Sequence, residues 1–219
     1  HKLKEKRTYK RYIDKALRVI DDGKPFFPMG IYTYTSATDD EEIAALTDSK
    51  LNLVVGESLM SKADMNTFYN KTKGQIRIIA IISHCLRKGT TEEKMDCVVN
   101  RVNDIKDSPA LFAYYLIDEP GVSSVGIMRQ ATLKIREMDP DHFIYSAINQ
   151  RLQMHILNEG VDVIGSDDYP VQHFDTLRSV VIVARQGRER LINSRAMWNI
   201  PQFFDWTCNG YENESSPTL

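Results

Sequence analysis

The stretch that decides the fold lies at residues 110–118, which read Ala-Leu-Phe-Ala-Tyr-Tyr-Leu-Ile-Asp. An apolar run of this kind is typical of a strand that is buried on both faces of a sheet. An amphipathic stretch at Ser123–Met138 follows it and stops before Asp139 and Pro140, because a proline cannot continue a helix. A buried strand followed at once by an amphipathic helix is the repeating unit of a parallel α/β fold.

The same unit recurs on both sides of this stretch. Short apolar runs rich in β-branched or aromatic residues alternate with longer stretches whose apolar residues recur every three or four positions. The pattern therefore predicts seven strands in one parallel sheet, with helices between them. We expect the strands at Phe26–Tyr34, Leu51–Ser58, Ile76–His84, Ala110–Asp118, His142–Ile148, Val161–Ser166 and Ala196–Phe204, and the helices at Asp39–Lys50, Ser61–Lys73, Thr91–Lys106, Ser123–Met138, Arg151–Glu159 and Asp175–Ile192.

Two architectures place helices around a parallel sheet: the open doubly wound sheet and the closed (β/α)8 barrel. The open sheet usually carries a glycine-rich phosphate loop after its first strand, whereas Tyr32–Ser36 contains no glycine. Polar and aromatic residues instead gather where the strands end, which is where a barrel collects its active site. We therefore predict a (β/α)8 TIM barrel. The residues at the strand ends are Tyr34, Glu57, His84, Glu119, Asn149, Asp168, Tyr169 and Asp205.

The alternation of strands and helices stops after the seventh strand. A closed barrel needs an eighth β/α unit, which takes roughly 60 more residues at typical barrel lengths. A barrel without this unit exposes two strand edges, which is costly, so we expect a further polypeptide segment or chain to complete it. On this interpretation residues 1–21 are a basic lead-in segment, residues 22–206 are the barrel and residues 207–219 are an irregular tail.

The composition is that of an ordinary globular protein. The chain has 219 residues, of which 42% are hydrophobic and 26% are charged, so it can bury a core without metal or disulfide staples. Its formal net charge of −2 gives no indication of a nucleic-acid partner. No apolar run reaches the ~20 residues of a membrane span. Without a phosphate loop, a dinucleotide fingerprint or a metal-binding motif, we expect no cofactor and no metal site.

Cysteines and glycosylation sequons bear on where the protein works. Cys85, Cys97 and Cys208 do not have metal-ligand spacing, and a bridge between Cys85 and Cys208 would need long loops. Cys97 lies between apolar positions of a helix, which predicts a buried thiol. Sequons begin at Asn70 and Asn213 and permit N-glycosylation, so we expect a secreted, extracellular glycoprotein.

Four segments, taken in order along the chain, resemble strands of the barrel glycoside hydrolases. Together they span about residues 22–206, and their order and spacing are specific for the superfamily but not for one substrate. They are Asp22–Gly30 (DGKPFFPMG), similar to the first strand, Pro109–Pro120 (PALFAYYLIDEP), similar to the fourth, Val161–Pro170 (VDVIGSDDYP), similar to the sixth, and Trp198–Phe204 (WNIPQFF), similar to the seventh.

The resemblance implies a pair of catalytic carboxyls. Glycoside hydrolysis needs one carboxyl to protonate the leaving oxygen and another to attack the sugar or to activate water. In the large retaining clan the acid/base glutamate ends the fourth strand, commonly in Asn-Glu-Pro, and Asp118-Glu119-Pro120 matches that position with Glu119. Burial against aromatic strand residues would raise the pKa of Glu119 toward a working range. The structural alternative is that Glu119 caps the next helix or pairs with a base.

The second carboxyl has several candidates. The nucleophile of the clan is a glutamate at the end of the seventh strand, where this chain has the neutral Gln202. Asp205 lies three residues further on, and Asp167 or Asp168 at the sixth strand would suit an inverting pair. The missing eighth strand is a further source. The separation of the carboxyls would decide, because retention requires ~5 Å and inversion a wider gap.

Other strand-end residues are candidates for binding the sugar. In the resembling enzymes a histidine near the third strand touches the sugar, and a tyrosine at the sixth often positions a catalytic carboxyl. Aromatic rings also stack on the apolar face of a pyranose. We expect substrate contacts from Tyr34, Glu57, His84, Tyr169, Gln202 and Trp206, with a role in the barrel rim as the alternative for Glu57 and His84.

Two functions remain open, and carbohydrate is the partner in both. The first is a glycoside hydrolase with Glu119 as general acid/base. The second is a catalytically inactive barrel that serves as a structural or carbohydrate-binding extracellular glycoprotein, an alternative that the neutral Gln202 favours.

Overall fold

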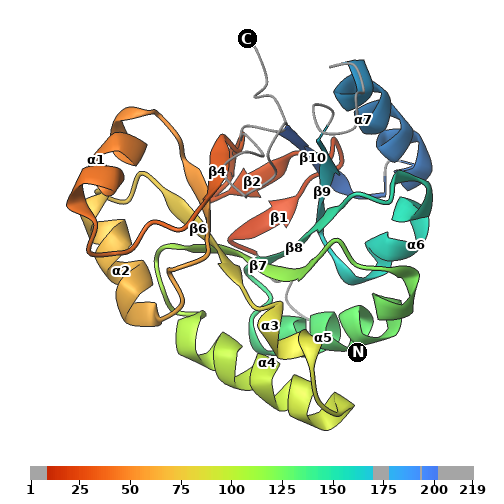
Figure 1. The fold of residues 1–219 in the computed structure, drawn as a ribbon, viewed down its shortest axis with the longest axis horizontal. Coiled ribbons are helices and arrows are strands. Elements are labelled where there is room, and N and C mark those ends of the chain that lie inside the picture. Colours follow the sequence, from red (N-terminus) through yellow and green to blue (C-terminus); the bar gives the residue numbers. More distant parts are fainter. Residues whose placement is uncertain (1–8, 170–177, 193, 202–219) are drawn as a thin grey trace, which may run out of the picture.

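The computed structural model describes residues 9–169, 178–192 and 194–201. Its main element is a curled sheet of seven parallel strands in the order β10-β9-β8-β7-β6-β5-β4, so each strand pairs with its neighbour in the chain. Helices lie around the outside of the curl (Figure 1). The expected seven strands and their α/β class are therefore confirmed. The strands are β4 Gly30–Thr33, β5 Leu53–Gly56, β6 Arg77–Ile81, β7 Leu111–Asp118, β8 Phe143–Ile148, β9 Val163–Asp168 and β10 Ala196–Pro201.

The helices follow the expected positions with shorter bounds. The helix expected at Arg151–Glu159 is one α-helical turn between two 3-10 turns, and α3 is a single turn that the sequence pattern did not predict. Thr90 and Glu93 form a reciprocal capping box at the start of α4, which fixes where that helix begins. The helices are α1 Asp40–Asp48, α2 Lys62–Lys71, α3 His84–Arg87, α4 Thr91–Ile105, α5 Val125–Met138, α6 Met154–Leu157 and α7 Arg178–Leu191, with 3-10 turns η1 Val122–Ser124, η2 Arg151–Gln153 and η3 Asn158–Gly160.

Two apolar layers explain why the strands are apolar on both faces. The outer layer lies between the sheet and the helices, where Tyr114 and Ile164 pack with helix residues such as Val102. The inner layer fills the curl and contains Phe112, Tyr115, Tyr145 and Val163. Trp198 packs in this inner layer, with its ring centroid 5.6 Å from that of Tyr145. Among the described residues, no helix combines the length and apolarity needed to cross a bilayer.

The first described residues form a small antiparallel sheet of β1 Arg11–Ile13, β2 Val19–Asp21 and β3 Lys24–Pro25. Val19 belongs to the inner apolar layer, and the buried Arg11 is paired with Asp21 at 2.7 Å. Arg77, at the start of β6, also lies within 3.7 Å of Asp21, so this sheet sits at the end of the curl where the strands begin. Residues 11–21 of the expected lead-in segment are thus packed against the barrel strands.

The curled sheet has two outer strands, β4 and β10, and within the described residues each pairs on one side. Phe27 and Met29 precede β4 and leave 78% and 51% of their surface exposed. Exposed apolar side chains beside an unpaired strand edge are what a missing neighbour would cover. The fold is therefore a partial barrel in the part of the chain that the structure describes.

Candidate functional site

Glu119 directly follows β7 in an uncommon backbone conformation. Its φ is 45°, in the left-handed region that residues with a side chain rarely adopt. The pairing of β7 with β8 is irregular between Tyr115 and Asp118, and the Glu119 amide donates to the carbonyl of Ala147 at 3.0 Å. This irregularity ends the strand and fixes where Glu119 leaves it. Strained residues of this kind often occur at functional sites.

The side chain of Glu119 meets residues from the ends of two neighbouring strands. It is hydrogen-bonded to Asn149, which follows β8, and to Asp167, near the end of β9. Burial raises the pKa of Glu119, and the negative charge of Asp118 raises it further, while both hydrogen bonds act in the opposite direction. The expected rise in the Glu119 pKa is therefore present, with burial as its main cause.

Asp167 is the buried member of this pair, with 5% of its surface exposed. Its Oδ2 accepts a hydrogen bond from the Tyr169 hydroxyl at 2.8 Å, and its buried Oδ1 has no hydrogen-bond partner of its own among the described residues. Burial raises the pKa of Asp167 to about 7, and the charges of Glu119 and Asp118 add to the rise, against the effect of Tyr169. Two carboxyls can be hydrogen-bonded only if one carries a proton, so Glu119 and Asp167 share a proton near neutral pH.

Tyrosine hydroxyls of the inner layer lie next to the carboxyls. Tyr115 donates to Oδ1 of Asp118, and the hydroxyls of Tyr32 and Tyr145 are 3.0 Å apart. Burial raises the pKa of Tyr32, Tyr115 and Tyr145, so these hydroxyls stay protonated and neutral. Gly165 is required here because an added Cβ would lie 2.3 Å from the Tyr145 hydroxyl. The apolar inner layer therefore ends in a neutral polar surface facing the carboxyls.

Glu57 brings a further carboxyl from the end of β5. Its amide donates to the carbonyl of Thr33 at 3.0 Å, which places it at the same end of the sheet as Glu119. Burial and the charge of Asp118 raise the pKa of Glu57, and Arg87 in α3 lowers it. We call Glu57, Asp118, Glu119 and Asp167 the acidic cluster.

Asp168 lies on the other side of β9 from the acidic cluster. Its Oδ2 accepts a hydrogen bond from the hydroxyl of Ser179 in α7 at 2.6 Å. Successive side chains of a strand point to opposite faces, so Asp167 faces the inside of the curl and Asp168 the helices. The geometry therefore favours Asp167 over Asp168 as a site residue. Alternation along β9 could have shown from the sequence that Asp167 and Asp168 face opposite sides, and the structure shows that the side of Val163 and Asp167 is the inner one.

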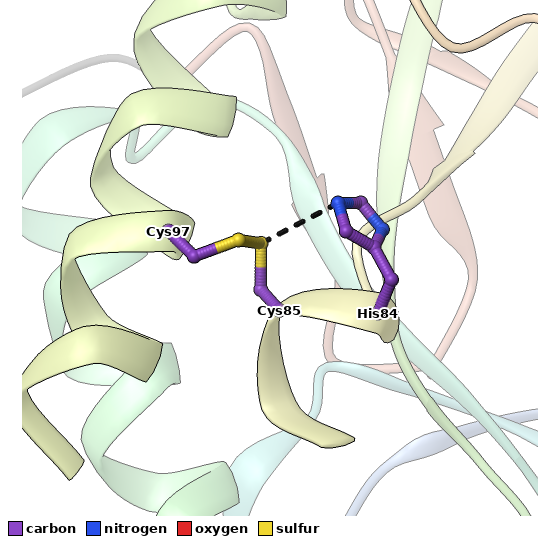
Figure 2. Close-up of side chains that lie close together, drawn as sticks. All are labelled: His84, Cys85 and Cys97. Carbon is purple, nitrogen blue, oxygen red and sulfur yellow. Dashed lines mark hydrogen bonds between the residues drawn. A yellow bond between two sulfur atoms is a disulfide. The ribbon is translucent and has the colours of Figure 1, made fainter. Parts of the chain in front are cut away.

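His84 lies beside a disulfide. Cys85 and Cys97 are joined, with their Cα atoms 5.3 Å apart, and the bond ties α3 to α4 (Figure 2). The expectation that Cys97 is a free buried thiol is wrong, because the unpredicted turn α3 brings Cys85 against α4. Nε2 of His84 is 3.5 Å from Sγ of Cys85, and burial and the charges of Arg101 and Arg87 lower the pKa of His84.

These side chains do not form a metal site in this state. Ligand atoms of His84, Cys85 and Cys97 lie within 4.8 Å of one another, as metal ligands do. Both sulfurs are bonded to each other, however, and a single remaining imidazole does not hold a metal ion. The contacts of His84 thus place it beside the disulfide.

Some of the other predicted residues lie within the described part of the chain, and the rest lie outside it. Tyr169 is at the site through its bond to Asp167, and Tyr34 follows β4 with 77% of its surface exposed. Asn70 is exposed on α2, and its glycosylation stays a prediction. The predictions for Gln202, Asp205, Trp206, Cys208 and Asn213 lie outside the described residues.

Comparisons with known proteins bear on the fold. No family model and no curated protein sequence matches this chain. A putative β-galactosidase from Bacteroides fragilis matches 88% of the chain with a TM-score of 0.66 and 13% identity. A β-glucuronidase from Parabacteroides merdae matches 86% of the chain with a TM-score of 0.62 and 12% identity. A GH2 β-galacturonidase from Eisenbergiella tayi, bound to galacturonate, matches 83% of the chain with a TM-score of 0.64 and 10% identity.

The fold is glycoside-hydrolase-like. Identities this low establish the fold alone, and the chain spans 30%, 26% and 36% of the length of these three structures, respectively. The activities named for them are activities of larger proteins.

Proposed function

We propose that this glycoside-hydrolase-like chain belongs to a protein that hydrolyses O-glycosidic bonds, with Glu119 as the general acid/base. The observation that carries the proposal is the proton shared by Glu119 and Asp167 at the end of the sheet where barrels hold their active sites. A general acid must hold a proton near working pH and face the substrate. The raised pKa of Glu119 and its contact with the protonated Asp167 support the first requirement, and its exposed side chain supports the second.

Asp167 acts in this proposal as a positioning residue. The two carboxyls of a hydrolytic pair stand on opposite sides of the scissile bond, ~5 Å apart for retention and farther for inversion. Glu119 and Asp167 are in hydrogen-bonding contact, which leaves no space for a sugar between them. In this proposal Asp167 donates a proton in its hydrogen bond to Glu119, and that proton passes to Glu119 as Glu119 gives its own to the leaving oxygen. Asp167 thus supports the protonation of Glu119 and takes no part in attack on the sugar.

The second working carboxylate must come from elsewhere around the mouth of the barrel. Among the sequence candidates, Asp205 has the right place in the strand order, because it follows β10, three strands away from β7. We therefore keep Asp205 as the proposed second carboxylate. A segment that completes the barrel between β4 and β10 is the other source, and we infer such a segment from the two edges and from the exposed Phe27 and Met29.

The test is hydrolysis by the full chain of aryl glycosides in both anomeric forms. Glu119→Gln should lower kcat/KM by about a hundredfold or more, the usual contribution of a general acid. Asp167→Asn should displace the basic limb of the pH–rate profile, where a general acid loses its proton, which loss of structure alone would not do. Asp168→Asn, a matched change on the helix side of β9, should leave the profile in place. Unchanged hydrolysis in Glu119→Gln would refute the assignment.

A catalytically inactive carbohydrate-binding or structural glycoprotein is the second candidate. The observation in its favour is Gln202, a neutral residue where the resembling clan has its nucleophile. Binding of a glycan without turnover, unaffected by Glu119→Gln, would support it over the enzyme. For either function we propose an extracellular location, since disulfides such as Cys85–Cys97 persist in oxidising compartments.

A further inference from the structure

Three side chains of metal-ligand type converge where α3 meets α4. His84 and Cys85 are neighbours in α3, and Cys97 reaches them from α4 (Figure 2). Nε2 of His84 is 3.5 Å from Sγ of Cys85, and the ligand atoms of all three residues lie within 4.8 Å of one another. The fold therefore brings these ligand atoms together without a metal ion.

The spacing of these atoms suits a tetrahedral zinc ion. Bonds of ~2.3 Å to sulfur and ~2.0 Å to nitrogen at tetrahedral angles put a nitrogen and a sulfur ligand about 3.5 Å apart. The His84–Cys85 pair already has this separation. The two sulfurs, bonded to each other in this state, would have to separate to about 3.8 Å as thiolates on zinc, and rotation of the cysteine side chains provides that movement. One imidazole and two thiolates are a ligand set that zinc takes in proteins, with a fourth position left for water.

A buried arginine beside the bridge has unpaired donors. Arg101 lies one helical turn after Cys97, on the same face of α4, and its charge also reaches His84. Its side chain is 10% exposed, and Nη1 donates to Asp104 at 3.1 Å, whereas Nε and Nη2 are buried and have no hydrogen-bond partner among the described residues. A sulfur without charge is a weak acceptor, but a thiolate is an anion that a neighbouring arginine stabilises. The unpaired donors thus favour the reduced, thiolate form of the cysteine pair.

From these contacts we propose that the reduced chain binds Zn²⁺ through Nε2 of His84 and the sulfurs of Cys85 and Cys97. Two molecules of a low-molecular-weight thiol supply two electrons and two protons and become a disulfide, while the S–S bond of the chain breaks and leaves two thiols. Zn²⁺ then displaces one proton from each thiol to solvent and bonds to both thiolates and to the imidazole. This site does not depend on the hydrolytic function proposed for Glu119.

The disulfide and the zinc site exclude each other, because both use the same two sulfurs. In an oxidising compartment the disulfide predominates. At the proposed extracellular location the zinc form therefore belongs to the chain before its bridge closes, or after a thiol has opened it. Bound zinc would then tie α3 to α4 in place of the bridge.

The test compares the oxidised full chain with the same chain reduced by a phosphine, which converts the bridge and one water into two thiols and a phosphine oxide. Zn²⁺ alone is the probe, its dissociation constant is measured by competition with a chromophoric chelator, and Co²⁺ reports thiolate ligation through its charge-transfer absorption. We expect the reduced chain to bind one Zn²⁺ roughly a hundredfold or more tighter than the oxidised chain. Zinc should also slow alkylation of Cys85 and Cys97 about tenfold or more, as located by peptide mass, because a ligated sulfur is a poorer nucleophile.

Variants assign the ligands. His84→Ala keeps both cysteines and should weaken Zn²⁺ binding by the reduced chain about tenfold or more, whereas His155→Ala, the same change at an exposed position of α6, should not. Cys208→Ser removes the cysteine that lies outside the described residues and should leave the affinity unchanged. Arg101→Gln should move the metal-free alkylation of Cys97 to higher pH, because a nearby positive charge lowers the pKa of a thiol, and a merely structural role of Arg101 would not move this profile.

The outcomes decide the proposal in each case. Equal zinc affinity of the oxidised and reduced chains, or no binding by either, would overturn the site, as would equal effects of His84→Ala and His155→Ala. A loss of affinity in Cys208→Ser would also overturn it. If the reduced chain unfolds without metal, Zn²⁺ should restore its native circular dichroism, and less so in His84→Ala, because ligation is then coupled to folding. Failure of zinc to restore the signal would count equally against the site.

Discussion

The raised pKa of Asp167 should leave a signature in how stability depends on pH. Folding lifts the pKa of this carboxyl from 3.8 to about 7. The folded state therefore binds one more proton than the unfolded state between these two values, so the free energy of unfolding falls as pH rises through this window. Three pKa units at 1.36 kcal/mol each correspond to roughly 4 kcal/mol, lost between about pH 4 and pH 7 and constant above.

Asp167→Asn should remove this dependence. The amide oxygen can accept from Tyr169 and the amide nitrogen can donate to Glu119, so asparagine copies the protonated aspartic acid. Urea unfolding of both proteins at each pH from 4 to 8 gives the difference in free energy of unfolding, in which unrelated titrations cancel. The difference should favour the variant increasingly with pH, at up to about 1.4 kcal/mol per pH unit.

A second variant tests the cause of the shift. Tyr169→Phe removes a hydrogen bond that holds the pKa of Asp167 down, so the fall in stability should extend above pH 7. A difference between wild type and Asp167→Asn that stays flat from pH 4 to pH 8 would refute the reasoning, because it would mean that Asp167 ionises in the folded state as it does in the unfolded chain.

Three further changes test the scaffold, each by urea unfolding. Cys97→Ala opens the bridge to Cys85, whose sequence separation is 12, and should cost about 2–3 kcal/mol, a loss that disappears if wild type is reduced first. Gly165→Ala should cost about 1–3 kcal/mol, since the new Cβ meets the Tyr145 hydroxyl; an unchanged midpoint would contradict the packing. Arg11→Met leaves the part-buried Asp21 without its main partner and should cost about 2–3 kcal/mol, with Lys10→Met as the neutral control.

The strands could be predicted because burial on both faces makes them apolar throughout, and a strand such as Leu111–Asp118 contrasts sharply with the amphipathic helix after it. Glu119 could be placed for the same reason, as the first residue after a well-marked strand. Its chemistry needed the structure. The irregular pairing between β7 and β8 and the positive φ of Glu119 set its contact with Asp167. Neither feature produces a periodic pattern of apolar residues, so neither can be recognised in the sequence.

The features that were missed are short or depend on tertiary contacts. A helix of one turn such as His84–Arg87 has too few residues to show a hydrophobic period. Because this turn brings Cys85 against α4, the Cys85–Cys97 bridge could not be predicted without it. Arg11 appeared to be one of several solvated bases, but its partner Asp21 lies on the neighbouring strand and allows its burial. Asp168 remained a candidate beside Asp167 because a strand that is apolar on both faces does not show in its sequence which face lies inside the curl.

The backbone at Glu119 also sets a compromise between stability and activity. A left-handed conformation costs a residue with a side chain about 1–2 kcal/mol, and glycine would avoid that cost. The cheapest residue for the fold at this position is therefore one without a carboxyl. A search for stabilised variants would favour replacing Glu119, and the proton it shares with Asp167 would be lost with no sign of damage in the folding measurements.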